Sequence, residues 1–354
     1  MELEEFYIET KHLLPYRIDS SLNFKLRLKI ALSKYEELAN SYIVDTDVLD
    51  DIKDISKRLI DIVAQYEKGL HSSAYVKLQY LIQGKKGFPP KIDLMKTILQ
   101  FEENKHISFY RIRVMESIYE RKADEMFHIP LSMRGIVKTQ RYSAPGYPCL
   151  YLGESIYGCW EEMRRPTMQS CAVSRLECNK ELNIIDLSVP NQKEYLDIPE
   201  YQKLMPLLIS CMIPVVNHSD TYKPEYIIPQ LIIQWVLKNR KSKNIDGICY
   251  TSTHINSEFE FPDEKFINYA FPVYNIVNRH RFCRHLCDLF QVTDPTTNEL
   301  EKLKGNYGID AGTYGEDMEE DERKAENYTI SDFGNLEKRL LDTDKFPLRD
   351  IKYK

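Results

Sequence analysis

The residues best suited to chemistry lie between Gly135 and Glu162. This stretch reads as a turn rich in Gly and Pro, a short strand, and a helix that is expected to start near Ser155, a favoured helix N-cap. About two turns into that helix stand two adjacent carboxylates, Glu161 and Glu162. A carboxylate beside a reacting centre can stabilise developing positive charge. Adjacent helix positions point about 100° apart, so only one of the pair can face a given ligand squarely.

Two other spacings in the chain could also support chemistry. Cys283 and Cys287 are four residues apart, so a helix would place them on one face, with His280 as a third zinc ligand. No second Cys/His pair follows at zinc-finger spacing, so we favour helix packing and predict no metal. Arg121 and His128 have the spacing of an Arg-x6-His ribonuclease pair, but no further motif accompanies them. The phosphate-binding glycine loops and the Gly-x-Ser-x-Gly elbow do not occur.

Three sequence blocks resemble, in order, the RES family, which is named for an Arg, a Glu and a Ser. The segment Phe109-Tyr-Arg is similar to the family's opening strand, so Arg111 takes the place of its Arg. Arg113 is the alternative, because it lies two residues on and therefore on the same strand face. Arg141 and Tyr142 stand where the family has Arg-Trp.

The second and third blocks supply the other two residues. Tyr151 ends the next strand, and Glu162 lies eleven residues beyond it, which matches the family's Glu, with Glu161 one position short. The later Gly-Ile-Cys-Tyr-Thr-Ser segment resembles the family's closing pattern, so Ser252 takes the place of its Ser. Asn268 is similar to the Asn that follows. The resemblance covers residues 106–278.

The resemblance implies an enzyme that consumes NAD and a fold similar to ADP-ribosyltransferases. The bond broken would join nicotinamide to C1′ of ribose, and a carboxylate would favour the oxocarbenium-like ribose. Arginine suits the pyrophosphate because its guanidinium binds phosphates in a planar, bidentate way. The implied catalytic residues are Arg111, Glu162 and Ser252, and the implied NAD-binding residues are Arg111, Arg113, Arg141, Tyr142, Tyr151 and Asn268.

Three functions stay open from the sequence. The first is a toxin- or defence-like NAD glycohydrolase or phosphorylase, with water or phosphate as the acceptor and NAD as substrate rather than cofactor. The second is a protein ADP-ribosyltransferase. In that case Glu161 and Glu162 would resemble the paired acids of transferases that modify arginine. The third is a non-catalytic binding module. RES members often act beside an antitoxin, so an antitoxin or regulatory protein is an expected partner, and a homo-oligomer is left open.

The elements expected to position these residues suggest an α+β protein in three parts. Residues 1–90 are predicted to form a helical domain, because apolar residues recur at three- and four-residue spacing up to a Gly- and Pro-rich break. Residues 91–290 are predicted to form a mixed α/β RES domain, with strands near 108–114, 148–152, 182–187, 247–251 and 266–273. Residues 291–354 are expected to be a polar, acidic tail with a helix.

Composition limits the kinds of partner and the cellular compartment that we expect for the protein. The chain has 354 residues, with 48 Lys and Arg against 54 Asp and Glu, a net charge of −6. A nucleic-acid binder would need a basic excess or stripe, so we expect no nucleic acid. No apolar run is long enough to span a membrane, and the acidic N-terminus lacks a signal-peptide pattern. The eight cysteines are therefore expected to be reduced, in a cytoplasmic protein.

Overall fold

A computed structural model describes most of the chain. The described residues are 2–15, 17–100, 107–114, 122–166, 171–254, 263–274, 282–296 and 320–347. They form two compact units, the first from residues 1–97, 137–146 and 184–253, and the second from residues 98–136, 147–183 and 254–354. The chain passes between the two units five times. Each unit is described by itself.

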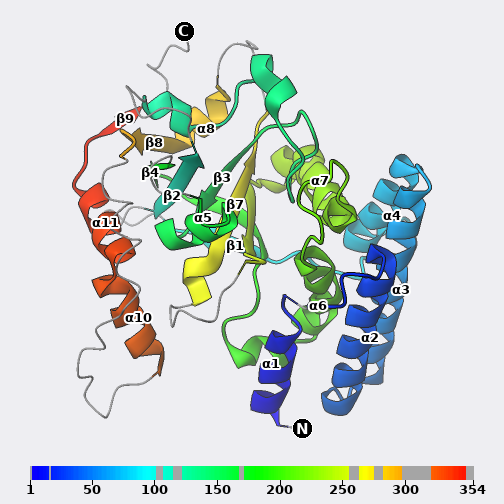
Figure 1. The fold of residues 1–354 in the computed structure, drawn as a ribbon. Helices are drawn as coiled ribbons and strands as arrows, with labels where there is room; N and C mark the ends of the chain where they lie inside the picture. The colour runs from blue at the N-terminus through cyan, green and yellow to red at the C-terminus, as the bar shows by residue number, and fades with distance from the viewer. Residues whose placement is uncertain are drawn as a thin grey trace. The chain divides into compact units, whose positions relative to one another are not determined.

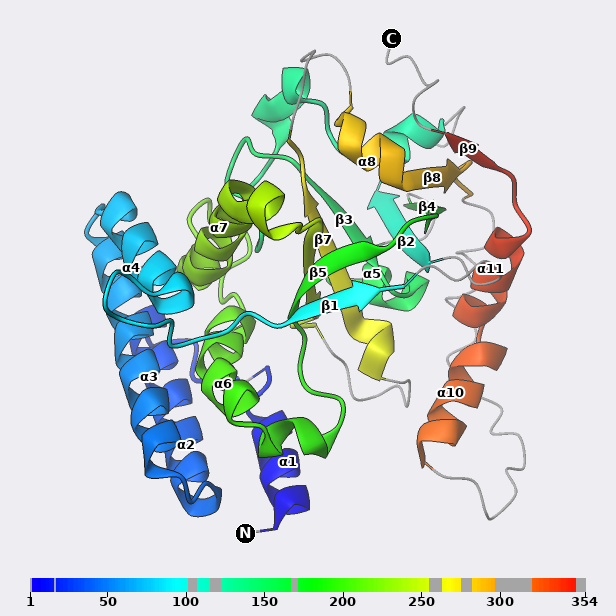
Figure 2. The same cartoon turned by 180° about the vertical axis from the view of Figure 1, so that it is seen from behind.

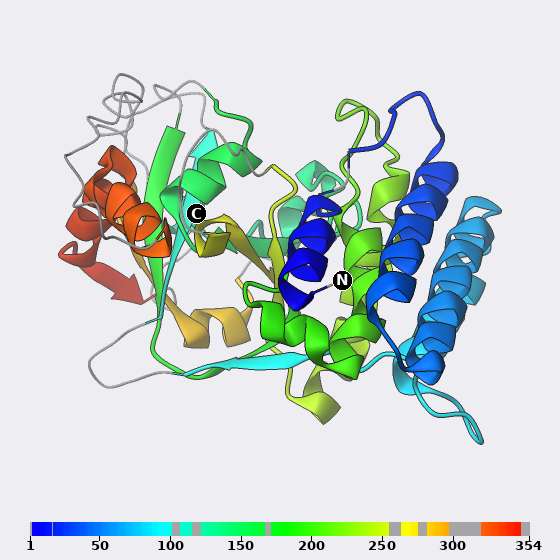
Figure 3. The same ribbon diagram turned by 90° about the horizontal axis from the view of Figure 1, so that it is seen from below.

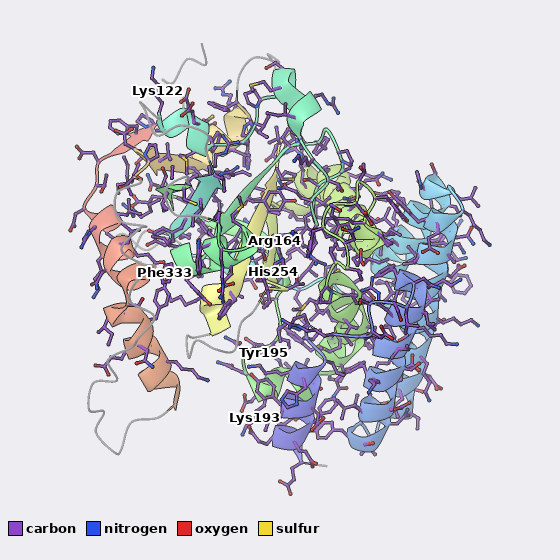
Figure 4. All side chains as sticks on the ribbon, in the orientation of Figure 1. Lys122, Arg164, Lys193, Tyr195, His254 and Phe333 are labelled. Atoms are coloured by element: carbon purple, nitrogen blue, oxygen red, sulfur yellow. The ribbon has the colours of Figure 1, made fainter. Side chains whose placement is uncertain are left out.

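The first unit is mainly helical. Its helices are α1 (Leu3–His12), α2 (Phe24–Tyr42), α3 (Thr46–Glu67), α4 (His71–Gln83), α6 (Pro199–Met212) and α7 (Ile227–Lys243). Helices α2, α3 and α4 run side by side, and α6 packs against both α2 and α3 (Figures 1 and 3). The short helical turn that holds Lys193 and Tyr195 contacts α1, where Lys193 forms an ion pair with Glu4 at 2.7 Å (Figure 4).

Helix α3 begins directly after an aspartate that caps it. The side chain of Asp45 accepts hydrogen bonds from the backbone N–H groups of Asp47 and Val48, at 2.9 and 3.3 Å, as expected of an N-cap. Most apolar residues with helical spacing are buried in this helix, and only Tyr66 near its end is half-buried. The buried ones are Val48, Ile52, Ile55, Leu59, Ile62 and Val63. Burial of this stripe is what stabilises the helix, because isolated helices are marginal in water.

The helices of residues 1–83 belong to the same compact unit as residues 184–253, which differs from the predicted division at residue 90. Two buried polar contacts join these segments. The Tyr35 hydroxyl donates to the backbone oxygen of Gln202 at 3.0 Å, and Arg27 forms a buried ion pair with Glu225. The amphipathic faces of the early helices are therefore covered by α6 and α7, from far along the chain.

The first unit also holds parallel strands. Strands β5 (Leu182–Leu187) and β6 (Gly247–Thr251) pair in parallel, with Ile184 opposite Gly247 and Leu187 opposite Tyr250. Strand β1 (Lys96–Leu99) neighbours β5 in the sheet order. The β5 and β6 strands coincide with the predicted segments, and all five residues of β6 are buried, as is common for parallel strands.

The second unit is built on antiparallel strands (Figure 2). These are β2 (Ile107–Val114), β3 (Cys149–Gly153), β4 (Cys171–Cys178), β7 (Ile267–Pro272), β8 (Phe290–Thr293) and β9 (Lys345–Pro347). They lie in the order β7-β3-β2-β4-β8-β9, and every neighbouring pair is antiparallel. The helices are α5 (Ile156–Glu162), α8 (Arg284–Leu289), α10 (Glu320–Ile330) and α11 (Asp332–Leu341).

The mixed helix-and-sheet architecture agrees with the predicted fold class. Helix α5 packs against β2 and β3, and α11 packs against both α5 and β4. The acidic run expected at residues 310–326 falls partly outside the described residues, and its last seven residues lie in α10. Across the described part of the chain, no helix is both long enough and apolar enough to cross a membrane.

Candidate active site

The start of helix α5 is fixed by Ser155 and Gly158. The Ser155 hydroxyl accepts a hydrogen bond from the Gly158 N–H at 2.8 Å and donates to the backbone oxygen of Lys265 at 2.6 Å. Gly158 packs so closely that an added Cβ would lie 2.4 Å from the same Lys265 oxygen. Any larger residue at position 158 would therefore push the helix away from this loop. The predicted helix start at Ser155 is confirmed.

Glu162, at the C-terminal end of α5, faces Asn268 on strand β7. The Asn268 side chain donates a hydrogen bond from Nδ2 to Glu162 Oε1 at 2.9 Å. Asn268 is 4% exposed and lies opposite Gly153 of strand β3. A Cβ at Gly153 would come within 3.3 Å of Asn268 Oδ1 and 2.6 Å of Cys159 Sγ. The small residue at 153 thus leaves room for the pair of predicted site residues, which the structure brings together.

Glu161 has a different environment from its neighbour. Its carboxylate forms an ion pair with Arg165, with contacts of 2.9, 3.1 and 3.1 Å to two guanidinium nitrogens. Arg164 and Arg165 adopt left-handed backbone angles, with φ of 62° and 50°, so the chain turns back after α5. The Arg165 guanidinium also lies over the Trp160 ring at 5.4 Å. The Glu161 carboxylate therefore forms an ion pair that stabilises the end of the helix.

Arg111 lies on β2 and is bonded to the strand that Tyr151 occupies. Its Nη1 donates to the backbone oxygen of Tyr151 at 3.1 Å, while its Nε is buried without a hydrogen-bond partner among the described residues. Burial, and secondarily the positive charge of Arg113, lower the pKa of the Arg111 guanidinium to about 9. It remains a cation at neutral pH. Arg113 donates instead to the backbone oxygen of Glu125.

Cys159 connects Arg111 and Glu162 electrostatically. Burial raises the pKa of the Cys159 thiol to about 12, with Arg111 acting to lower it and Glu162 to raise it. The thiol donates to the backbone oxygen of Tyr110 at 3.2 Å. Because both charged groups act on the same thiol, a cation and a carboxylate both lie near one buried position in the second unit.

Arg141 belongs to the first unit, where it caps helix α6. Its Nη1 donates to the backbone oxygens of Cys211 and Ile213 at 2.6 and 3.4 Å, and its Nη2 donates to the Thr253 hydroxyl at 3.1 Å. The guanidinium also lies over the Tyr226 ring at 5.2 Å. The last carbonyls of a helix have no partner within it, so this arginine satisfies them. Its predicted contact with pyrophosphate stays a prediction.

Tyr142 and Ser252 also belong to the first unit. Tyr142 is 1% exposed, and its ring lies 4.6 Å from that of Tyr250 at an angle of 44°. Burial raises the pKa of the Tyr142 hydroxyl well above its usual value. Ser252 directly follows strand β6 and is fully buried. The predicted residues therefore form two groups: Arg111, Arg113, Tyr151, Glu162 and Asn268 in the second unit, and Arg141, Tyr142 and Ser252 in the first.

The other spacings considered from the sequence have structural roles where they are described. The backbone N–H of Cys283 donates to His128 Nε2 at 2.8 Å, and the Cys283 thiol donates to the backbone oxygen of Tyr274. Arg121, which was paired with His128 by spacing, lies outside the described residues, and so does His280, which was considered as a zinc ligand beside Cys283 and Cys287. No group of three or more metal-ligating side chains occurs in the described segments, and all eight cysteines are free thiols.

Sequence reasoning missed Gly153 and Arg165. Gly153 directly ends the strand that carries Tyr151, and a glycine at such a strand end often marks close packing. Arg165 stands four residues after Glu161, a spacing that places opposite charges together on a helix. That spacing could have distinguished the two acids, since the residue four positions after Glu162 is Pro166.

Comparison with known proteins places this chain in a family. Residues 109–271 match the RES domain. The chain is 32% identical over 287 residues to a Bacillus subtilis (strain 168) protein named "Putative toxin YopC". The alignment covers 76% of this chain and 63% of that protein. The chain thus aligns with somewhat less than two thirds of its relative's length. No solved structure matches the chain, so the likeness to ADP-ribosyltransferases stays a prediction. Arg111, Glu162 and Ser252 all fall within the matched residues, and the chain is a member of the RES-domain, toxin-like proteins.

Proposed function

We propose that this protein degrades NAD by breaking the bond between nicotinamide and C1′ of the ribose. The observation that carries the proposal is the Glu162–Asn268 pair, a carboxylate held at 2.9 Å by an amide on the neighbouring strand of a RES domain. In the reaction the C1′–N bond breaks, its electron pair leaves with nicotinamide, and the ribose becomes oxocarbenium-like. A carboxylate near that ribose lowers the energy of this charge.

Arg111 supplies the other half of the proposed site. Its guanidinium is a cation whose buried Nε has no partner in the part of the chain that the structure describes, and a buried donor without a partner is costly. The pyrophosphate of NAD would provide oxygens for it. Ser252 would hydrogen-bond the ribose or the amide, and Tyr151 would lie along a ring of the substrate. NAD is the substrate, and no cofactor enters the proposal.

We favour water or phosphate as the acceptor over a protein side chain. Water attack at C1′ gives ADP-ribose, nicotinamide and a proton, whereas phosphate attack gives ADP-ribose 1″-phosphate. A protein ADP-ribosyltransferase was the alternative because Glu161 and Glu162 look like paired catalytic acids. Because Glu161 forms an ion pair with Arg165, the two carboxylates are in different environments and do not act as a pair in this proposal. We further propose that the protein acts in the cytoplasm, as a toxin held in check by an antitoxin or regulatory protein.

The test is the fate of NAD on incubation with the purified full-length chain. Nicotinamide release and NAD loss are measured by chromatography, in buffer with and without inorganic phosphate. ADP-ribose without phosphate indicates a glycohydrolase, and ADP-ribose 1″-phosphate formed only with phosphate indicates a phosphorylase. Radiolabel from NAD on protein indicates a transferase. If a folded protein leaves NAD intact under all these conditions, the proposed function is wrong.

A further inference from the structure

The C-terminal helical pair α10–α11 lies outside the residues that match the RES domain, yet it packs on the helix that carries Glu162. The Phe333 side chain of α11 is labelled in Figure 4. Its ring contacts the rings of Tyr157 and Trp160 on α5, with centroids 5.0 and 5.9 Å apart. Leu336 and Leu340 of α11 are buried in the same apolar cluster. A helix from beyond the matched region therefore forms part of the packing that holds α5.

Glu337 makes the polar contact at this interface. Its Oε1 accepts hydrogen bonds from the backbone N–H of Ile156, the first residue of α5, at 2.8 Å and from the Tyr328 hydroxyl at 2.5 Å. The first N–H groups of a helix have no partner within it, so Glu337 satisfies a group that α5 itself cannot. The short O–H···O distance is typical of a bond to an ionised carboxylate.

The position of α11 is fixed from its other end. Buried Arg175 of strand β4 donates to the backbone oxygens of Leu340 and Leu341 at 2.9 and 3.3 Å. Arg175 also pairs with Glu177 at 2.7 Å, and Lys345 of β9 pairs with the same carboxylate at 2.6 Å. Because these bonds anchor α11 to the sheet, Glu337 can hold α5 in a defined place instead of moving with it.

Neighbouring groups shift the pKa of Glu337 in both directions. Burial raises the pKa of this carboxyl from its usual value to about 7, and the negative charge of Glu154 adds to that effect. The hydrogen bonds from Tyr328 and Ile156 and the positive charge of Lys265 act in the opposite direction. Tyr110 and Cys159 also face it, and both are buried groups whose pKa values are raised. Glu337 therefore exchanges its proton in the neutral range.

We propose that ionised Glu337 is a positioning residue that fixes helix α5, and through it Glu162, for the reaction. The activity part of this inference rests on the proposed function, whereas the fixing of α5 does not. The hydrogen bonds of Glu337 to Ile156 and Tyr328 act on the helix rather than on a ligand, so its effect should appear in kcat with little change in KM. Protonation weakens both of its hydrogen bonds, because bonds to a charged acceptor are about twice as strong as neutral ones.

The first experiment compares Glu337→Gln with Glu326→Gln, which removes a carboxylate from an exposed position on α10. At pH 8 we expect Glu337→Gln to lower kcat for NAD about tenfold, an effect typical of a slightly misplaced catalytic group, with KM unchanged. The wild-type kcat should fall as pH drops through about 7, and the Glu337→Gln profile should lack this step. Glu326→Gln should follow the wild type.

Thermal unfolding separates positioning from a purely structural role. Because burial raises the pKa of Glu337, ionisation costs folding stability as pH rises through about 7. A neutral Gln avoids that cost, so its Tm at pH 8 should equal or exceed the wild-type value while kcat falls. A purely structural role predicts that Tm and kcat fall together, and that result would overturn the inference.

The second experiment does not depend on NAD. The chain has two tryptophans, and Trp235→Phe removes one whose indole N–H makes no hydrogen bond to any described residue, leaving Trp160 on α5 as the fluorescent reporter. We expect its emission to change with a midpoint near pH 7, and this change to disappear with Glu337→Gln but not with Glu326→Gln. A titration that persists with Glu337→Gln refutes the fixing of α5. If NAD is never consumed but the titration depends on Glu337, the proposed function fails and the positioning of α5 stands.

Discussion

Replacing Glu162 with Gln removes one negative charge and almost nothing else. The Gln side chain keeps an oxygen where Glu162 Oε1 accepts from Asn268 at 2.9 Å, so the hydrogen bond survives. Only its charge assistance is lost, which costs about 1 kcal/mol of folding stability. For a chain of this size that lowers Tm by about 2 °C or less.

The effect on turnover should be much larger than the effect on stability. A carboxylate that stabilises an oxocarbenium-like ribose acts mostly in the transition state. Losing it should slow NAD turnover by about 10²-fold or more, equivalent to about 2.7 kcal/mol and upward. NAD affinity should change little. Nicotinamide release under single-turnover conditions measures the chemical step, and a binding assay with NAD measures the affinity.

Glu161→Gln is the matched control and should give the opposite pattern. It breaks the ion pair with Arg165, whose side chain is 37% exposed, so the loss of stability should be about 1–2 kcal/mol after solvent screening. Turnover should be nearly unchanged. If Glu161→Gln abolishes turnover and Glu162→Gln does not, the catalytic position is wrong by one residue. If neither variant affects a folded protein that destroys NAD, this helix is not the catalytic element.

Three further predictions concern single side chains. Arg111→Ala should raise KM for NAD about tenfold or more with a smaller change in kcat, because a pyrophosphate keeps its charge from ground state to transition state; an effect confined to kcat would refute this role. Arg141→Lys should lower the free energy of unfolding in urea by about 2–3 kcal/mol, because lysine cannot donate to the oxygens of Cys211 and Ile213 together. Burial lowers the pKa of His128 to about 4, so wild-type stability should fall by about 3 kcal/mol between about pH 6.5 and 4 relative to His128→Gln. An equal fall in both proteins would contradict the burial of His128 as a neutral group, and the exposed His12→Gln is the control.

The sequence predicted strands β2, β3, β5, β6 and β7, and it missed β1, β8, β9 and, most consequentially, β4. That strand contains Arg175 and Glu177, and both are buried. Charged residues normally indicate a surface, so a strand that is buried along its whole length was not expected there. The arginine is buried because it donates to the backbone oxygens of Leu340 and Leu341, about 165 residues away. A single-sequence pattern carries no information about partners at that distance.

The prediction of a domain boundary at residue 90 was limited in the same way. The stripe on α3 predicted that one face would be buried, but not what would cover it. The covering helices α6 and α7 lie more than 100 residues later, and contacts such as Tyr35 with Gln202 join them to the early block. Within the site, the family resemblance identified Glu162 and Asn268, which the structure brings together. It could not show that Arg141 caps a helix, because that role depends on where α6 ends.

The contact between Ile156 and Glu337 joins residues that are 181 positions apart in the chain. During synthesis at about 5–20 residues per second, α5 leaves the ribosome about 10–35 s before the residue that holds its first turn. A nascent chain therefore passes through a stage in which the whole RES sequence has been made while α5 still lacks the contact from Glu337. Premature termination before Glu337 would release a protein with every predicted site residue present and its proposed catalytic helix without this restraint.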